Sequence, residues 1–239
     1  MRLHEHVQTL SQSWKDTLFP VRCLLCGVVG KHSPCPRCVD HKLGPTRPTL
    51  PKVPFGVTAL FAATAYEGDA RSLITALKYR GEKPVACGLA VLMAAALPDD
   101  LEVDVVTWAP TSVARRRKRG FDQAELLANE LAQRIGMVAT PTLTRLAAAS
   151  QGGVLLPDRR SERHQTGRSL SDRKTGVRFA TLPALFGSET LITSVLLVDD
   201  VVTSGATMAA AAVALRGVGV REVWASCAAF TPRSDLSTN

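Results

Sequence analysis

The stretch VLLVDDVVTSGATM, residues 195–208, decides what fold this chain is expected to have. A β-branched, apolar run leads into two adjacent carboxylates, Asp199 and Asp200, and an alanine-rich segment typical of a helix follows. This order predicts a buried strand, a short loop and a helix. Backbone N–H groups at the start of a helix form a phosphate cradle when hydroxyl side chains lie beside them and a glycine permits close approach. The loop consists of Thr203, Ser204, Gly205, Ala206 and Thr207.

A simpler interpretation of this stretch is a buried parallel strand followed by an ordinary capped helix. Thr203 or Ser204 would then serve only as the N-cap. We favour phosphate binding because a strand of that simpler kind needs no paired acids at its end. We therefore expect the two aspartates to lie beside the hydroxyl groups of a bound sugar, and the loop to hold a phosphate.

The composition of the 239 residues narrows the class of protein. A hydrophobic content of 46% with 21% charged residues is that of an ordinary soluble globular chain, long enough for one large domain or one domain plus a small module. The net charge of +8 and the pI near 9.5 indicate polyanionic ligands, which are phosphates, nucleic acid or both. Aromatic residues make up only 5%, which argues against an extensive base-stacking platform.

The sequence also predicts a location in the cell. Residues 1–14 lack the apolar core of a signal peptide, and the longest apolar run, residues 86–97, is too short to cross a bilayer. We therefore expect a cytoplasmic protein without membrane insertion, in which thiols stay reduced.

Two Cys-x-x-Cys pairs lie close together near the N-terminus: Cys23 with Cys26, and Cys35 with Cys38. Each pair forms a turn that can present two thiolates to one cation, so the spacing predicts a structural zinc site with a closed coordination sphere. A disulfide pair would need an oxidising compartment. A redox Cys-x-x-Cys motif would need its usual βαβ setting.

Hydrophobic periodicity and turn residues divide the rest of the chain. Prolines spaced three apart at 45–54 predict a stiff polyproline II linker, with a partner-binding motif as the less favoured alternative. Cys87 is expected to be a small buried core residue. A strand or hairpin is expected at residues 57–66 and strands at 103–108, 195–198 and 220–230. Helices are expected at 69–81, 84–97, 121–135 and 205–216.

Residues 115–119 are five consecutive cations, Arg-Arg-Arg-Lys-Arg. They are expected to form a basic loop between the strand at 103–108 and the next helix, which is where open α/β sheets bind ligands. We favour diphosphate binding by this loop as a whole over a merely solvated run of charge. Residues 147–178 are long, polar and basic, and fit either a lid over a polyanion or a nucleic-acid contact.

In this order the elements resemble the ComF/GntX family, in which a four-cysteine zinc knuckle is joined to a phosphoribosyltransferase domain. The resemblance spans residues 23–230. It is carried by the two Cys-x-x-Cys pairs, Leu77-Lys78-Tyr79 with Gly81, Pro110 with Arg115 and Arg119-Gly120-Phe121-Asp122-Gln123, Gln165 with Arg173 and Phe179, and Val198-Asp199-Asp200.

Four positions depart from the family's pattern. The chain has Trp108-Ala109-Pro110 where Val-Pro-x-Pro is common, and Asp122 where Asn is frequent. Gly176 stands where an Asn is expected after the hood arginine, so that position offers no side chain for acceptor contact. Ser204 replaces the usual Thr and keeps the hydroxyl.

The resemblance implies a type I phosphoribosyltransferase fold, which is an α/β fold with a mainly parallel twisted sheet, flanking helices and a hood. It implies an N-terminal helix and zinc module at 1–44, a linker at 45–54, the phosphoribosyltransferase-like domain at 55–231 and a flexible tail at 232–239. It also implies that 5-phosphoribosyl-1-pyrophosphate (PRPP) binds with Mg²⁺. Asp199 and Asp200 would hold the ribose, residues 203–207 the 5-phosphate, Lys78, Arg115 and Arg119 the diphosphate, and Gln165 and Arg173 would lie on the hood or acceptor side.

Two functions follow from the resemblance. The first is a PRPP-dependent phosphoribosyltransferase that transfers the sugar phosphate to an unidentified acceptor. The second is a competence or DNA-uptake protein that binds single-stranded DNA or the uptake machinery and senses PRPP without turnover, because the same fold can serve as a sensor. An oligomer is compatible with either function.

Overall fold

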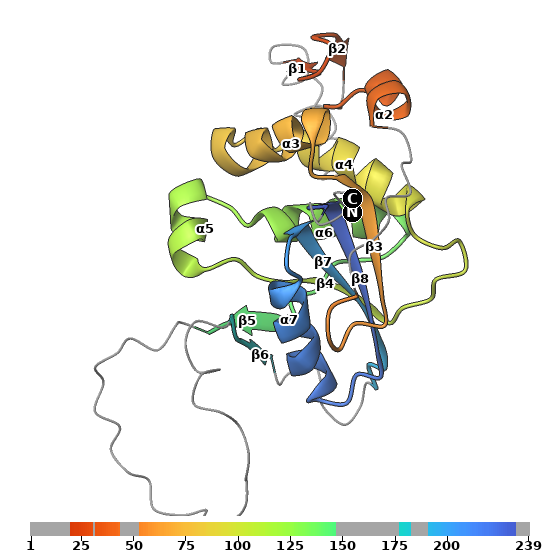
Figure 1. Cartoon of the computed structure of the whole chain (residues 1–239), viewed down its shortest axis with the longest axis vertical. Coiled ribbons are helices and arrows are strands. Elements are labelled where there is room, and N and C mark those ends of the chain that lie inside the picture. The colour runs from red at the N-terminus through yellow and green to blue at the C-terminus, as the bar shows by residue number, and fades with distance from the viewer. Residues whose placement is uncertain (1–19, 31, 44–52, 147–176, 183–190, 233–239) are drawn as a thin grey trace, which may run out of the picture.

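The computed structural model describes five stretches of the chain (Figure 1). They are residues 20–30, 32–43, 53–146, 177–182 and 191–232. The expected N-terminal helix, most of the linker at 45–54 and nearly all of the tail at 232–239 lie outside these stretches. The division of the chain into domains therefore stays a prediction.

A four-stranded parallel sheet forms the centre of the molecule, in the order β3-β8-β7-β4. Its strands are β3 (Ala59–Ala65), β8 (Glu222–Phe230), β7 (Ser194–Val202) and β4 (Val105–Trp108). All four were expected at these places. Because the strands are parallel, their carboxyl ends meet at one edge, where open α/β sheets bind ligands.

Strand β7 shows why the sheet is buried on both faces. Its side chains alternate, so that Leu196 and Val198 pack into one hydrophobic cluster and Val195 and Leu197 into the other. All four are fully buried. A strand covered on both faces needs a continuous apolar run, which is what the sequence has at this point.

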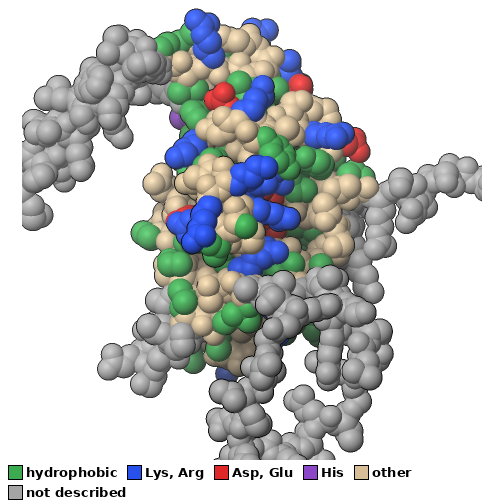
Figure 2. All heavy atoms as spheres, turned by 90° about the vertical axis from the view of Figure 1, so that its left-hand side faces the viewer, with side chains coloured by type: hydrophobic (Ala, Val, Ile, Leu, Met, Phe, Trp, Pro, Cys, Tyr) green, Lys and Arg blue, Asp and Glu red, His purple; other side chains and the backbone are tan. Residues whose placement is uncertain are grey.

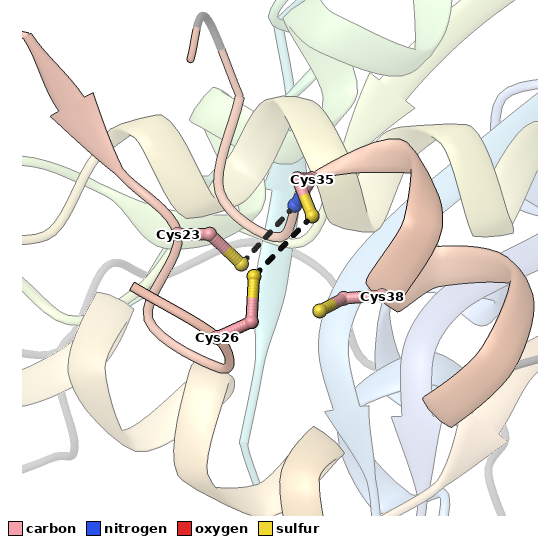
Figure 3. A group of neighbouring side chains, drawn as sticks. All are labelled: Cys23, Cys26, Cys35 and Cys38. Atoms are coloured by element: carbon pink, nitrogen blue, oxygen red, sulfur yellow. Dashed lines mark hydrogen bonds between the residues drawn. The ribbon is translucent and has the colours of Figure 1, made fainter. Parts of the chain in front are cut away.

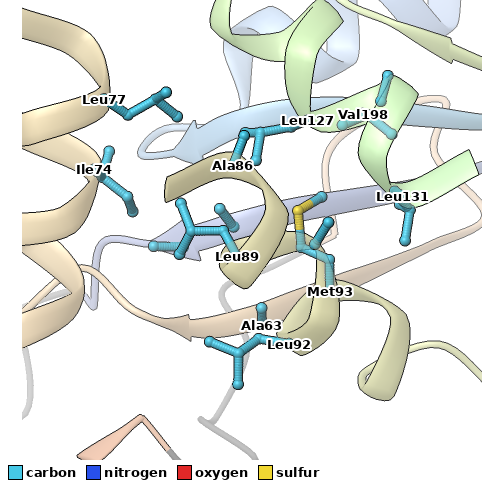
Figure 4. Packing of buried hydrophobic residues seen from close by; sticks show 14 of the residues in the cluster. Ala63, Ile74, Leu77, Ala86, Leu89, Leu92, Met93, Leu127, Leu131 and Val198 are labelled. Atoms are coloured by element: carbon cyan, nitrogen blue, oxygen red, sulfur yellow. The ribbon is translucent and has the colours of Figure 1, made fainter. Parts of the chain in front are cut away.

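Helices cover each face of the sheet. One face carries α3 (Gly68–Thr75), α4 (Pro84–Ala95) and α6 (Gln123–Arg134), and the other carries α7 (Ala206–Arg216). Figure 4 shows side chains of the first group, Leu89 and Met93 of α4 and Leu127 and Leu131 of α6, packed together beside Val198 of β7. The expected α/β class, with a parallel sheet between helices, is confirmed, whereas the phosphoribosyltransferase fold stays a prediction.

The expected helix at 69–81 has a change of geometry near its end. After α3 the chain continues as a π-helical turn, η1 (Ala76–Arg80), and ends at Gly81, whose φ of 70° is left-handed. Glycine adopts this conformation without the clash that a Cβ atom would cause. The turn carries Lys78 at its centre, and π-helical turns occur often at functional sites.

The basic run at 115–119 was expected to be a loop, and this expectation is wrong. The structure has a helix, α5 (Val113–Arg119). The Ser112 side chain accepts a hydrogen bond from the backbone N–H of Arg115 at 3.4 Å and caps the helix, and Gly120 ends it in a left-handed conformation. Charge repulsion alone therefore does not exclude a helix when both ends are capped and the side chains face solvent.

The short antiparallel sheet that follows α6 in the chain was not expected from the sequence. It pairs β5 (Leu143–Arg145) with β6 (Phe179–Thr181). These strands are only three residues each, too short for a periodic pattern to be recognised. Residues 147–176, which hold most of the predicted basic lid, lie between them and outside the described stretches.

The four-cysteine segment packs on α4. It consists of β1 (Val21–Arg22), β2 (Val29–Gly30) and α2 (Pro36–Lys42). A Cβ atom added to Gly88 of α4 would lie 2.5 Å from Cδ of Pro34, so the two segments approach as closely as glycine allows.

Cys87 lies at this contact rather than in the core, which corrects the expectation for it. Its side chain is half-buried. Its Sγ atom is 3.1 Å from Nδ1 of His32 and accepts a hydrogen bond of 3.0 Å from Nη2 of Arg134. Apolar periodicity places a residue on the inner side of a helix but does not say which neighbour covers it.

No helix among the described residues is both long enough and apolar enough to cross a membrane.

Candidate functional site

A cavity of about 370 Å³ lies at the carboxyl edge of the parallel sheet. Figure 2 shows Lys and Arg side chains gathered around a few acidic ones in the middle of this face. The cavity lies between segments that follow β3, β4 and β7, together with η1, α5 and the start of α6. Its charged lining residues are Lys78, Arg115, Arg119, Arg145, Asp122, Asp199 and Asp200.

The acidic pair comes from the second half of β7. The backbone N–H of Asp200 donates a hydrogen bond of 2.8 Å to Oδ1 of Asp199. Oδ1 of Asp200 lies 3.1 Å from Nζ of Lys78, and both side chains of this ion pair are 16% exposed. The motif Leu77-Lys78-Tyr79 and the motif Asp199-Asp200, more than a hundred positions apart, therefore meet in one site.

Burial raises the pKa of Asp199, and the adjacent Asp200 carboxylate raises it further. The hydrogen bond from Asp200 and the charge of Lys78 lower the pKa and only partly compensate. Hydroxyl donors or a divalent cation would therefore stabilise the charged form of this acid pair. Carboxylate oxygens are ligands that Mg²⁺ favours, so the residues present fit a magnesium ion bound together with a phosphorylated ligand.

The loop at 203–207 lies beside Asp199 and opens helix α7. Gly205 is the N-cap of the helix, with a left-handed φ of 76° and no side-chain cap, so neither Thr203 nor Ser204 is the N-cap. Ser204 Oγ accepts only a long hydrogen bond of 3.4 Å from the N–H of Ala206. A hollow of about 30 Å³ is lined by all five loop residues and by Asp199. This is the arrangement expected of a phosphate cradle.

The geometry of α5 divides the basic run between two surfaces. Arg115 and Arg119 are four residues apart, and both line the cavity. Nη1 of Arg119 donates a hydrogen bond of 2.6 Å to Oε1 of Gln123. Its guanidinium lies 5.2 Å from the centre of the Tyr79 ring, within the range of a cation–π contact. Arg116 instead forms an ion pair of 3.4 Å with Glu125, outside the cavity lining.

Asp122 lines the cavity, but both of its carboxylate oxygens already accept hydrogen bonds from backbone N–H groups. Its Oδ2 accepts from the N–H of Thr111 at 2.7 Å, and its Oδ1 accepts from the N–H of Ala124 at 3.0 Å, which caps α6. The side chain is buried, and burial raises its pKa. Asp122 therefore holds the loop after β4 against the start of α6 and supports the cavity wall.

Several cavity residues were not assigned from the sequence. They are Tyr66, Tyr79, Thr111, Gln123 and Arg145. Tyr79 and Gln123 lie inside motifs that carried the resemblance, so their position was the available signal. The sequence held no such signal for Arg145, because this residue lies on β5, a strand that was not expected. Burial lowers its pKa, and the charge of Arg115 lowers it further, which indicates that the two cations lie near each other.

Gln165 and Arg173, predicted for the hood or acceptor side, lie outside the described residues. The side of the cavity that would receive an acceptor therefore stays a prediction.

The four cysteines form a second candidate site, away from the cavity (Figure 3). Their Sγ atoms lie within 4.8 Å of one another, and those of Cys26 and Cys35 are 3.7 Å apart. Tetrahedral zinc with Zn–S bonds of about 2.3 Å requires separations of roughly 3.8 Å. The Cys35 backbone N–H also donates to Sγ of Cys23 at 3.3 Å, as amides do around metal-bound thiolates. The four close cysteines could therefore bind a metal such as zinc.

Comparison with known proteins found similarity to two relatives that share one name. No protein-family model matches the chain. The chain is 28% identical over 221 residues to the DNA utilization protein YhgH of Salmonella typhimurium strain LT2, a match that covers 86% of this chain and 83% of the relative. The protein of the same name from Salmonella typhi matches with the same identity and coverage.

Proposed function

We propose that the cavity binds PRPP together with Mg²⁺, as in type I phosphoribosyltransferases. One observation carries the proposal: an acidic pair, a phosphate-type loop and three predicted cations, from separate parts of the sequence, line the same cavity. Its volume of about 370 Å³ is in the range of small-molecule sites.

Each part of the ligand has a chemically matched surface. The ribose hydroxyls would donate to Asp199 and Asp200. The 5-phosphate would bind the loop at 203–207, where amide donors and hydroxyls are available. The diphosphate would bind Lys78, Arg115 and Arg119. Bound Mg²⁺ would neutralise charge on the diphosphate, held by ligand oxygens and the acidic pair.

Phosphoribosyl transfer is the reaction that such a site would serve. The bond between ribose C1 and the diphosphate breaks, and negative charge develops on the leaving diphosphate. Lys78, Arg115 and Arg119, which line the cavity, would stabilise that charge, and such stabilisation is usually the largest contribution to catalysis of this kind. The acceptor that would attack C1 is not identified by the described residues.

Calorimetry with PRPP and Mg²⁺ tests the binding step. The protein with Asp199→Asn and Asp200→Asn is expected to bind PRPP at least about 100-fold more weakly, because two hydroxyl acceptors lose their charge. Asp100→Asn, which removes an exposed carboxylate outside the cavity, is the matched control and is expected to bind like the wild type. Equal affinity in the double variant and the wild type would contradict the proposal.

Diphosphate release then separates an enzyme from a sensor. A transferase releases diphosphate from PRPP when offered a suitable nitrogen-containing acceptor, and the Asp199/Asp200 variant does not. A protein that binds PRPP but releases no diphosphate with a broad acceptor panel is a sensor.

A second proposed function, DNA binding, has separate support. The relatives are named DNA utilization proteins. Arg116, Arg117 and Lys118 of α5 are exposed and do not line the cavity. Cations on an exposed helix can contact phosphates of single-stranded DNA, while the cavity senses PRPP.

Fluorescence anisotropy with single-stranded DNA at increasing salt tests this second function. Arg117→Glu with Lys118→Glu is expected to weaken binding and to reduce the salt dependence by about two phosphate contacts. Arg221→Glu, an exposed cation beyond the amino end of β8, is the control. Binding that does not depend on salt, or no binding, would contradict this function.

A further inference from the structure

Lys78 and Asp200 form the least exposed of the three ion pairs among the described residues. Their side chains are 16% exposed, whereas the other two pairs have exposures between 32% and 62%. Both partners line the cavity. Exposed pairs contribute little to stability, but a pair shielded from water holds its partners more firmly.

The neighbours of Lys78 on its π-helical turn are buried, whereas the Lys78 side chain is partly exposed in the cavity. Leu77 and Ala76, on the same π-helical turn, are fully buried, and Gly81 ends the turn in a left-handed conformation. The lysine side chain has a flexible four-carbon stem and carries its charge at a single point. Its Nζ atom can therefore move from one anion to another within the cavity without a change of fold.

The acidic pair has one cation partner for two carboxylates. Asp199 accepts a hydrogen bond from the backbone N–H of Asp200, and Asp200 forms an ion pair with Lys78. No ion pair joins Asp199 to another side chain among the described residues. A divalent cation that approaches the pair alone meets a like charge already in contact with Asp200, whereas a diphosphate supplies a second anion to which that lysine can turn.

We propose that Lys78 is the counter-ion of the acidic pair and prevents a free divalent cation from binding there, so that metal and diphosphate bind together. This inference rests on the proposed function and deepens it by giving the order in which the ligands enter. Arg115 and Arg119, which also line the cavity, provide the first contacts for the diphosphate. Lys78 then leaves Asp200 for the diphosphate and opens the carboxylate to the metal.

A lysine that only stabilises the fold predicts a different result. Its removal would weaken every ligand or unfold the protein. If Lys78 is a counter-ion, its removal is expected to raise the affinity for the metal and to lower the affinity for diphosphate. The same substitution frees the carboxylates for a metal and removes a donor to the diphosphate. A tighter site for the metal together with a weaker site for the diphosphate is therefore the result that separates a counter-ion from a lysine that only stabilises the fold.

Mn²⁺ binding, followed by electron paramagnetic resonance on the zinc-loaded protein, tests the proposal. The wild type is expected to bind Mn²⁺ weakly alone and more tightly with inorganic diphosphate. Lys78→Met is expected to bind Mn²⁺ alone about tenfold more tightly and diphosphate about tenfold more weakly, the usual size of coupling between two sites. Lys78→Arg keeps the charge and is expected to leave Mn²⁺ binding weak.

Arg115→Met is the matched control. It removes a cavity cation that forms no ion pair with the acidic pair. It is expected to weaken diphosphate binding and to leave the affinity for Mn²⁺ alone unchanged.

The two proposals fail in different titrations. A Lys78→Met variant that binds Mn²⁺ alone no more tightly than the wild type overturns the counter-ion proposal. A wild-type protein that binds neither diphosphate nor PRPP in the presence of the metal overturns the proposed function.

Discussion

The four-cysteine cluster and the cavity are built in opposite ways. The cluster takes four donors of one kind from residues 23–38, and the thiols face one another. The cavity combines acids, bases and hydroxyls from segments between Tyr66 and Thr207, and among the described residues Asp199, Arg115 and Arg145 form no ion pair. A closed set of identical donors suits an ion that stays bound. An open set of mixed charges suits a ligand that comes and goes.

The two regions also differ in how they affect stability. Metal binding to a closed cysteine site is coupled to folding, because the unfolded chain has no preformed site. In the cavity, by contrast, Asp199 is held in surroundings that oppose its charge. The cysteine cluster is therefore expected to stabilise the fold when it holds a metal, and the cavity is expected to destabilise it, as is common where a protein binds an exchangeable ligand.

The largest expected effect tests the structural role of the cluster. Cys35→Ser with Cys38→Ser is expected to remove the bound zinc and unfold the segment at 20–43, since structural zinc contributes roughly 10–16 kcal/mol in small zinc modules. Metal analysis and hydrogen exchange measure the two changes. Cys87→Ser, which changes a cysteine outside the cluster, is expected to keep the zinc. Full zinc content in the double variant would contradict the assignment.

The next effect tests whether the cavity destabilises the fold. Burial and Asp200 raise the pKa of Asp199 to about 8, so the folded protein binds a proton that the unfolded chain releases above about pH 4. Stability is therefore lost as the pH rises through this window. Asp199→Asn cannot ionise and is expected to raise the free energy of unfolding by about 2 kcal/mol at pH 8 and far less at pH 4.

Thermal unfolding at both pH values, without ligand, measures this difference. Asp100→Asn, which changes an exposed carboxylate outside the cavity, is the control and is expected to leave the free energy of unfolding close to that of the wild type. If Asp199→Asn raised the free energy of unfolding equally at pH 4 and pH 8, the surroundings of Asp199 would not disfavour its charged form.

The smallest effect tests how closely the segment that holds the cysteine cluster packs on α4. In Gly88→Ala the new Cβ would lie 2.8 Å from the backbone nitrogen of Pro34, which cannot move away freely. The clash is expected to exceed the gain in helix propensity and to cost a net of about 1 kcal/mol. Limited proteolysis of the cysteine segment and thermal unfolding measure it, with Val91→Ala on the exposed side of α4 as control. Unchanged protection of the segment would contradict the close packing.

The sequence predicted the parallel sheet well because its signals are local. The apolar run before Asp199 marks a strand buried on both faces, and Pro84 marks the start of α4. The loop at 203–207 was likewise visible from its residue types. The prediction was wrong for α5, because a run of cations carries no apolar stripe and its helix depends on the caps at Ser112 and Gly120.

The sequence by itself determined the chemistry that is available: four thiols at metal-binding spacing, two adjacent acids and a basic run. Only the tertiary structure decided which of these groups meet. It brought Lys78 to Asp200, added Arg145 from β5, and used Asp122 as a helix cap. The physical reason is that strand and loop formation depend on neighbours along the chain, whereas charge pairing depends on which parallel strands end side by side.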